Sequence, residues 1–348
     1  MDIVVLCGGL SNERDVSISS GTDAARALRS RGHRVLLVDL FFGFEGDLGA
    51  GRAVFDQPQE DLHWRVGEQA PDLHELCRIR QARGGSLIGP NVIELCRLAD
   101  IAFLALHGEE GENGKLQAAL DLAGVKYTGS GYLGSAIAMD KELTKIMLTA
   151  AGIATPPGML LHRDDPRENT VGYPCVVKPC SGGSSVGVSI VHSREAFLAA
   201  LDMAFEYENS VLVERYIAGR EFTVGLMDGR AMPAIEIIPK SGFYDYKNKY
   251  QAGLTQEVCP APLSEEDTQR LQRLAEATME ALHVDVYCRC DYIMDADGTF
   301  YCLEANTLPG MTPTSLIPQM ARAQGYDYAA LCEQIIAASL KRYEGQTA

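Results

Sequence analysis

Apolar residues near the start of the chain gather in short continuous runs, and this pattern predicts a parallel α/β domain. Residues 3–7 form an uninterrupted apolar run that ends in Gly8 and Gly9, and a polar segment and a predicted helix follow. Residues 34–40 form the next predicted strand. Strand, glycine turn, helix and strand in this order are typical of a parallel sheet, which binds ligands at the carboxyl ends of its strands.

Candidate ligand contacts lie at these carboxyl ends. Glu13 lies in the segment GGLSNER after the first strand, and Ser17 follows in the helix. Each of the two side chains is either a ligand contact or a cap of that helix. Residues 101–106 form another buried strand, and His107 follows it among glycines. This histidine is either a ligand contact or a structural side chain, and both interpretations stay open.

The second half of the chain alternates short strands with helices. The predicted strands are residues 173–179, 188–191 and 210–217. The predicted helices are the segment capped by Ser193 and residues 264–282, 314–323 and 327–342. A proline-containing segment at 155–158 indicates a domain boundary.

A predicted hairpin in the last third of the chain carries a candidate metal site. Residues 287–304 form two strands joined by an Asp-Gly turn. Asp291 lies on the first strand, and Glu304 and Asn306 lie on one face at the end of the second. Three converging oxygen donors suit Mg²⁺ better than zinc. A surface hairpin with solvated acids is the alternative.

Composition narrows the class of protein. The chain has 348 residues, of which 46% are hydrophobic and 22% charged, as in an ordinary enzyme of two or three domains. Its formal net charge is −16, so we expect neither a nucleic-acid nor a membrane partner. An anionic ligand therefore has to be bound by lysines and arginines placed locally.

The cysteines indicate a reducing compartment. Ten of them are scattered through apolar runs, which is typical of buried, reduced thiols and predicts a cytoplasmic protein. Cys288, Cys290 and Cys302 leave a soft-metal site as an alternative, but their apolar neighbours favour packing. The first apolar run is too short for a signal peptide, and none reaches the ~18 residues of a membrane span.

The loop CSGGSSVG follows the strand that carries Lys178. Its glycines and the hydroxyls of Ser184 and Ser185 are suited to surround phosphate oxygens, although the loop lacks the Lys-Ser or Lys-Thr ending of a P-loop. Lys141 and Lys249 are further cations for phosphates. With the candidate metal site, these residues supply the parts needed for phosphoryl transfer.

Together these motifs resemble the ATP-grasp ligases, and within them the D-alanine-D-alanine ligases. The resemblance rests on GGLSNERDVS, HGEEGENG, MDK, VVKPCSGGSSVGVS, VERYIAGREFTV, FYDYKNKY and RCDYIMDADGTFYCLEANTLPGMTPTSL, in this order. It covers nearly the whole chain. Residues 41–98 are the weak region and contain no motif that we can assign.

The resemblance implies a three-domain ATP-grasp fold, α/β in class and α+β in its C-terminal part. The expected domains are an N-terminal parallel α/β domain at 1–128, a central domain at 129–213 and a C-terminal domain at 214–348. ATP would lie between the sheets of the last two domains. A lid at about 240–253 would close over the site.

The resemblance also implies a nucleotide and metal site. The residues expected to contact ATP are Lys141, Lys178, Ser185, Glu214, Tyr216, Ile217, Glu221 and Lys249. Two Mg²⁺ ions, which Mn²⁺ could replace, would share Glu304. Asp291 would hold one of them and Asn306 the other.

The implied reaction joins two D-alanine molecules through a D-alanyl phosphate and supplies peptidoglycan synthesis. Glu13 would bind the ammonium group of the first D-alanine, with His107 nearby. Tyr250 would close the site by hydrogen bonds with Glu13 and Ser184. The lid would thereby keep water from the acyl phosphate.

The implied contacts to the intermediate and the second substrate lie after the metal hairpin. Arg289 and the N–H of Gly310 would donate to the oxyanion. Ser315 and Leu316, at the start of a helix, would bind the second carboxylate.

Departures from the family pattern are few. Asn113 replaces an aspartate found in many relatives, and Thr314 stands where some have histidine. The lid YDYKNKY matches dipeptide-forming members, although D-serine or another amino acid at the second position is the alternative. Family resemblance also leads us to expect a homodimer through the N-terminal domain.

Overall fold

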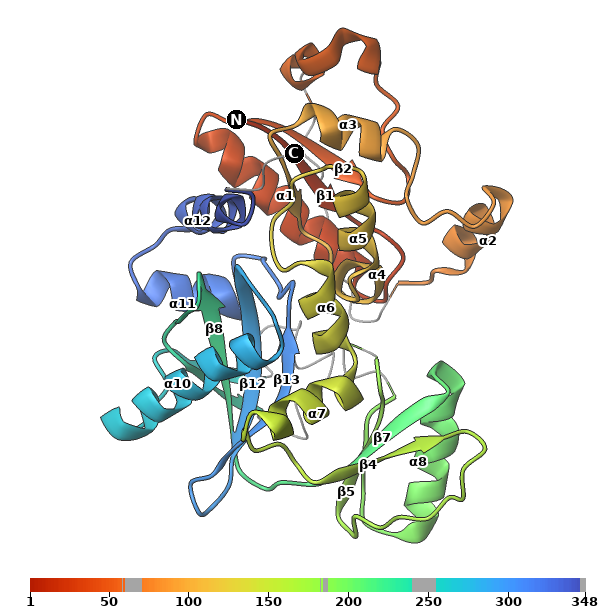
Figure 1. Ribbon diagram of the computed structural model, residues 1–348, viewed down its shortest axis with the longest axis vertical. Coiled ribbons are helices and arrows are strands. Elements are labelled where there is room, and N and C mark those ends of the chain that lie inside the picture. Colours follow the sequence, from red (N-terminus) through yellow and green to blue (C-terminus); the bar gives the residue numbers. More distant parts are fainter. Residues whose placement is uncertain (58, 60–70, 182, 184–186, 240–254, 345–348) are drawn as a thin grey trace.

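The computed structural model describes residues 1–57, 59, 71–181, 183, 187–239 and 255–344. Within these residues one parallel and two antiparallel sheets lie in separate parts of the molecule (Figure 1). The mixed α/β class predicted from the sequence is confirmed. None of the helices in these ranges is long and apolar enough to cross a membrane.

The first sheet is parallel and has the strand order β2-β1-β3. Its strands are β1 (Asp2–Cys7), β2 (Arg34–Asp39) and β3 (Ile101–Leu104). The helix α1 (Arg14–Ser30) connects β1 to β2. Gly8 and Gly9 precede it with φ values of 75° and 77°, which glycine adopts without strain. The loops after β1 and β3 therefore open at the same edge of the sheet, as predicted.

Residues 41–98 add short helices beside this sheet. The elements are the 3₁₀ segment η1 (Leu48–Asp56), α2 (His74–Ala82) and α3 (Val92–Leu98). Val54, Val92 and Leu95 are completely buried in the core of the first sheet. The region that contained no motif therefore takes part in the packing of the N-terminal domain.

The second sheet is antiparallel, with the order β4-β7-β5-β6. Its strands are β4 (Gly158–His162), β5 (Cys175–Pro179), β6 (Ser189–Val191) and β7 (Ser210–Arg215). The helices that lead to it from the first sheet are α4 (Glu109–Glu112), α5 (Lys115–Leu122), α6 (Tyr132–Met139) and α7 (Lys141–Ala150). Phe197 and Leu201 of α8 (Arg194–Tyr207) pack completely buried against this sheet.

The third sheet is antiparallel, with the order β11-β10-β8-β12-β13 and β9 beside β8. Its strands are β8 (Arg220–Met227), β9 (Arg230–Ala231), β10 (Ile235–Pro239), β11 (Thr255–Val258), β12 (Tyr287–Met294) and β13 (Phe300–Asn306). Leu271 and Ala275 of α10 (Glu265–Ala281) are completely buried against it.

Cys288, Cys290 and Cys302 lie in the core of the third sheet and are completely buried. In the described part of the chain, no group of three or more His, Cys, Asp or Glu side chains is arranged to hold a metal ion. The complete burial of these cysteines in an apolar core agrees with the packing interpretation.

The last two helices return the chain to the first sheet. They are α11 (Leu316–Ala323) and α12 (Tyr328–Lys341). α12 packs beside α1 (Figure 1), and its residues Leu331 and Ile335 belong to the same core as β1 and β3. Arg31, which follows α1, and Asp327, which precedes α12, form an ion pair of 2.8 Å. The domain boundaries at 128 and 213 stay predictions.

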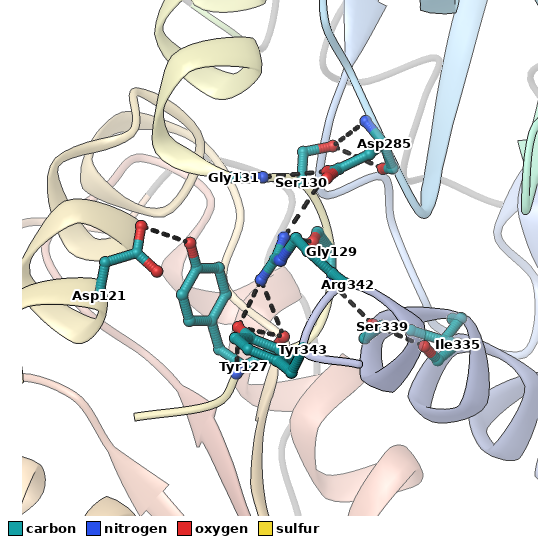
Figure 2. Close-up of polar contacts among 10 residues, drawn as sticks. All are labelled: Asp121, Tyr127, Gly129, Ser130, Gly131, Asp285, Ile335, Ser339, Arg342 and Tyr343. Carbon is teal, nitrogen blue, oxygen red and sulfur yellow. Dashed lines mark hydrogen bonds and ion pairs between the residues drawn. The ribbon is translucent and has the colours of Figure 1, made fainter. Parts of the chain in front are cut away.

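Arg342, the residue after α12, lies where three segments meet: the end of α12, residues 127–131 and the residues around Asp285 (Figure 2). Its guanidinium donates to the carbonyl oxygens of Gly129 at 2.6 Å and Tyr127 at 3.3 Å, and it also lies over the Tyr127 ring. Asp285 lies 3.6 Å from Arg342 and accepts the N–H of Gly131 at 3.1 Å. Arg342 therefore joins the end of α12 to the segment between α5 and α6.

Candidate active site

The β12–β13 hairpin brings the predicted metal ligands together. Asp291 lies directly opposite Glu304, and Arg289 lies opposite Asn306 in the antiparallel register. Asp291 is 8% exposed, whereas Glu304 and Asn306 are half-buried. Side chains opposite one another, or two residues apart, project from the same face of a hairpin. The three predicted ligands are therefore neighbours.

Hydrogen bonds position the Asp291 carboxylate. Thr223 of β8 donates to it at 2.6 Å, and Nε and Nη2 of Arg289 donate at 3.0 and 2.9 Å. Nδ2 of Asn306 donates to Asp291 at 3.2 Å and to Glu304 at 3.5 Å. These oxygen donors fit Mg²⁺ in type. Because Asn306 presents its nitrogen to the carboxylates, binding of a metal through its oxygen requires the amide to rotate about its last bond.

Glu214, at the end of β7, is a buried carboxylate between two lysines. Lys178 of β5 lies 2.5 Å from Oε2, and Lys145 of α7 lies 2.5 Å from Oε1. Burial would raise the pKa of Glu214, but the two ammonium groups outweigh it and hold this pKa below the usual range. Burial would lower the pKa of Lys178, and the attraction of Glu214 outweighs it and raises this pKa. Burial also lowers the pKa of Lys145, and the Glu214 carboxylate opposes this change.

Lys141 begins α7 and is buried beside this cluster, with 8% exposed. Burial lowers the pKa of its ammonium group, and the Glu304 carboxylate opposes this change. The N–H of Lys141 donates to the carbonyl of Cys180 at 3.1 Å. This bond ties the start of α7 to the start of the glycine-rich loop.

The glycine-rich loop is anchored at its first serine. Both the N–H and the hydroxyl of Ser181 donate to the carboxylate of Glu208 at the end of α8, the N–H at 2.8 Å. Four predicted site residues lie outside the described part of the chain: Ser184, Ser185, Lys249 and Tyr250. Their roles, and the predicted lid at about 240–253, stay predictions.

The predicted adenine and ribose contacts lie where the chain crosses from the second sheet to the third. Tyr216 follows β7, and its N–H donates to the carbonyl of Pro174 at 3.1 Å. Ile217 is 9% exposed. Glu221 lies on β8 opposite Ile293 of β12. Tyr216 and Ile217 thus lie in the connection between β7 and β8, and Glu221 lies in the third sheet. Their contacts with the nucleotide stay predictions.

Glu13 lies in a cavity of about 320 Å³ between the N-terminal domain and the second sheet. The walls include Ser11 and Gly108 from the loops after β1 and β3, and Ser181 and Gly183 from the glycine-rich loop. Glu13 is 8% exposed. The cavity is large enough to hold an amino acid, and Glu13 is a carboxylate that an ammonium group could contact.

Both ring nitrogens of His107 form hydrogen bonds within the protein. Nε2 lies 2.9 Å from the hydroxyl of Ser20, and Nδ1 lies 2.8 Å from the carbonyl oxygen of Leu308. Burial lowers the pKa of His107, and the nearby Glu13 carboxylate opposes this change. The histidine thus has the structural role that the sequence left open, and its contact with the substrate stays a prediction.

Gly310 and Ser315 lie next to each other at the start of α11. A Cβ on Gly310 would come within 2.9 Å of the Ser315 hydroxyl, so glycine permits this close approach. The Ser315 hydroxyl accepts the N–H of Thr312 at 3.1 Å. Leu316 is the first residue of α11. The residues predicted to bind the second carboxylate therefore lie at a helix N-terminus.

Lys145, Glu112 and Glu208 were not predicted from the sequence. Lys145 lies one helical turn after Lys141, and this spacing was a usable signal. Glu112 lies in the run GEEGEN, where no local feature distinguishes a buried glutamate from its exposed neighbours. The contact of Glu208 with Ser181 depends on tertiary structure alone.

Two family models match the chain. The model described as the D-ala D-ala ligase N-terminus matches residues 2–130, and the model described as the D-ala D-ala ligase C-terminus matches residues 147–337. The chain belongs to the D-alanine-D-alanine ligase family. The resemblance inferred from the sequence motifs is thereby confirmed.

Individual members and neighbours agree with this assignment. The D-alanine-D-alanine ligase of Lacticaseibacillus casei is 43% identical, over 100% of this chain and 98% of that protein. The crystal structure of the D-alanine-D-alanine ligase from Bacillus anthracis complexed with ATP has a TM-score of 0.75 and 31% identity, over 100% of both chains. The VanG D-Ala:D-Ser ligase from Enterococcus faecalis has a TM-score of 0.75 and 26% identity, over 97% of this chain and 99% of that one.

Proposed function

We propose that this chain catalyses the ATP-dependent ligation of two D-alanine molecules to D-alanyl-D-alanine, which supplies peptidoglycan synthesis. One arrangement carries the proposal. Asp291, Glu304 and Asn306 form an oxygen-rich hairpin, and the buried cations Lys141 and Lys178 lie close enough for Glu304 to influence their pKa values. Membership of the family supports D-alanine as the substrate.

Lys141 and Lys178 would neutralise the phosphates of ATP. Asp291, Glu304 and Asn306 fit Mg²⁺, or Mn²⁺ in its place, and a metal bound there would draw negative charge from the transferred phosphoryl group. The adenine would lie between the second and third sheets. There Glu214, Tyr216 and Ile217 would contact the base, and Glu221 would accept from the ribose hydroxyls.

A carboxylate is a poor electrophile, so the first D-alanine has to be activated. Transfer of the γ-phosphoryl group to its carboxylate gives an acyl phosphate and ADP. The amine of the second D-alanine then attacks the carbonyl carbon, and phosphate leaves. Arg289 and the N–H of Gly310 would stabilise the oxyanion, and loss of one such donor typically lowers the rate by ~10²–10³.

The two amino acids would enter from different sides of the reacting carbon. Glu13 would bind the first ammonium group, with His107 behind it. Ser315 and Leu316 would bind the second carboxylate at the start of α11. By family resemblance, Tyr250, Lys249, Ser184 and Ser185 would complete the closed site and exclude water.

A second candidate is the ligation of D-alanine to D-serine, and the VanG neighbour is the observation that favours it. The identity to that ligase is 26%, compared with 43% to the Lacticaseibacillus casei enzyme. Side-by-side assays of phosphate release with D-alanine alone and with D-alanine plus D-serine distinguish the two. A clear preference for the mixed pair would replace the first proposal.

The decisive measurement is ADP release that depends on D-alanine and Mg²⁺, with the product identified by mass. We expect stoichiometric D-alanyl-D-alanine and ADP. ATP turnover without dipeptide would refute the proposal. We further propose a homodimer on the basis of family resemblance, and sedimentation of a monomer at assay concentration would contradict it.

A further inference from the structure

Glu112 is a buried carboxylate that joins two loops from distant parts of the chain. It is the last residue of α4 and is 8% exposed. Oε2 accepts the N–H of Gly108 at 2.7 Å, and Oε1 accepts the N–H of Leu308, 196 positions away, at 3.2 Å. Each oxygen of one carboxylate therefore holds the backbone of a different loop.

Leu308 begins the segment that carries Gly310, and the N-terminal domain holds this segment at both ends. The carbonyl of Leu308 accepts from Nδ1 of His107 at 2.8 Å. The hydroxyl oxygen of Ser20 accepts the N–H of Met311 at 3.3 Å, and the same hydroxyl pairs with Nε2 of His107. Gly310 therefore lies between two residues whose backbone groups are bound to side chains of the first domain.

We propose that Glu112 is a positioning residue that fixes the backbone of residues 308–311 and, with it, the N–H of Gly310 at the acyl centre. The inference rests on the proposed function, in which this N–H donates to the oxyanion. A donor that is already in place needs no reorganisation when negative charge develops, and this gives preorganised donors their large effect on rate. Charged groups that face Glu112 are Glu13 and Arg289.

A carboxylate suits this position better than an amide. Two N–H donors meet two acceptor oxygens, whereas a glutamine offers one oxygen and turns its NH₂ group toward the second N–H. Burial, together with repulsion from Glu13, raises the pKa of Glu112 to about 7. Ionisation of Glu112 therefore lowers the stability of the folded protein. Groups with perturbed pKa values of this kind cluster at functional sites.

Steady-state kinetics of Glu112→Gln above neutral pH test the inference. We expect kcat to fall ~10- to 100-fold, within the range for loss of a supporting contact or a misplaced oxyanion donor. The KM for ATP should stay within about twofold, because the predicted nucleotide contacts lie elsewhere. Glu110→Gln is the matched control, since Glu110 lies in the same helix and is half-exposed. It should keep the wild-type kcat.

A cycle with Ser20→Ala separates positioning from simple stabilisation. Ser20 and Glu112 hold the same segment, so their effects on kcat should not add. A folded Glu112→Gln with unchanged kcat, or strictly additive effects, overturns the inference. Should Glu112→Gln fail to fold, Glu112→Asp, which is too short to reach both N–H groups, should show the same loss, and an unchanged kcat in it overturns the inference. A wild-type protein that forms no dipeptide refutes the proposed function instead.

Discussion

The ammonium group of Lys178 lies 2.5 Å from Oε2 of Glu214, and both side chains are buried. Lys145 binds the other oxygen of this carboxylate and also donates to the hydroxyl of Thr155 at 3.0 Å. A buried carboxylate left without a partner is strongly destabilising. With Lys145 in place, Glu214 keeps a partner when Lys178 turns toward a phosphate of ATP.

Lys145→Met should therefore weaken ATP binding although Lys145 itself is not predicted to touch ATP. Without it, Lys178 is the sole cation beside Glu214 among the contacts described above and is less able to serve the phosphates. We expect the KM for ATP to rise ~10-fold, which corresponds to ~1.4 kcal/mol. The KM for D-alanine is the internal control and should not change. Equal changes in both constants would point to general loss of structure.

Glu304→Gln should remain folded and lose ADP formation. The substitution keeps the shape of the side chain and removes the charge that two Mg²⁺ ions would share. Loss of metal-assisted charge stabilisation amounts to several kcal/mol, so turnover should fall by ~10³ or more. Asp297→Asn, in the exposed turn of the same hairpin, is the control. If Glu304→Gln retains turnover, Glu304 is not the metal ligand that we propose.

Arg342→Met should destabilise the protein without touching the proposed site. The side chain is 18% exposed, and its loss leaves the carbonyls of Gly129 and Tyr127 without this donor. We expect the free energy of unfolding to fall by about 2–4 kcal/mol in urea titrations. Lys341→Met is the matched control, because Lys341 is 57% exposed and pairs with an exposed Asp228, so its effect should be below about 1 kcal/mol. An equal loss of unfolding free energy in Arg342→Met and Lys341→Met would contradict the stabilising role of Arg342.

The stability of the wild type relative to Glu112→Gln should depend on pH. From about 4.5, the ordinary pKa of a glutamate, to about 7, the native state keeps the Glu112 proton that the unfolded chain has released. The free energy of unfolding of the wild type therefore falls, relative to the variant, as pH rises through this window, by at most ~1.4 kcal/mol per pH unit. Above about pH 7 the difference in unfolding free energy between the wild type and Glu112→Gln should become constant. Urea midpoints measured across this range test the trend, and a pH-independent difference would contradict it.

Fold elements with a local signal were predictable from the sequence. The apolar run of β1, the capping serine Ser193 before α8 and the turn at Gly298 each lie within a few residues of the structure they specify. β4 was not predicted, because its short segment GMLLH follows two prolines and does not alternate clearly. The helices of residues 41–98 lacked any motif, and α2 has no buried residue that would create an apolar face.

The same distinction between local and tertiary signals applies to the residues of the candidate site. The proximity of Asp291, Glu304 and Asn306 was predictable because a single hairpin brings them together, and their binding of a metal stays a prediction. Glu112 was not, since its partner Leu308 lies in a loop whose path depends on the packing of the first and third sheets. Lys145 was not recognised because its importance comes from Glu214, on a strand of another layer.

The packing of α12 against α1 has a consequence for how the chain acquires its structure during synthesis. The ribosome releases β1, β2 and β3 early, but Leu331 and Ile335, which complete the core beneath them, are made after all the other elements described above. The first sheet therefore cannot finish its core as an independent early unit, in contrast to chains whose domains fold one after another as they emerge. The nascent N-terminal half therefore keeps apolar surface exposed until α12 has left the ribosome.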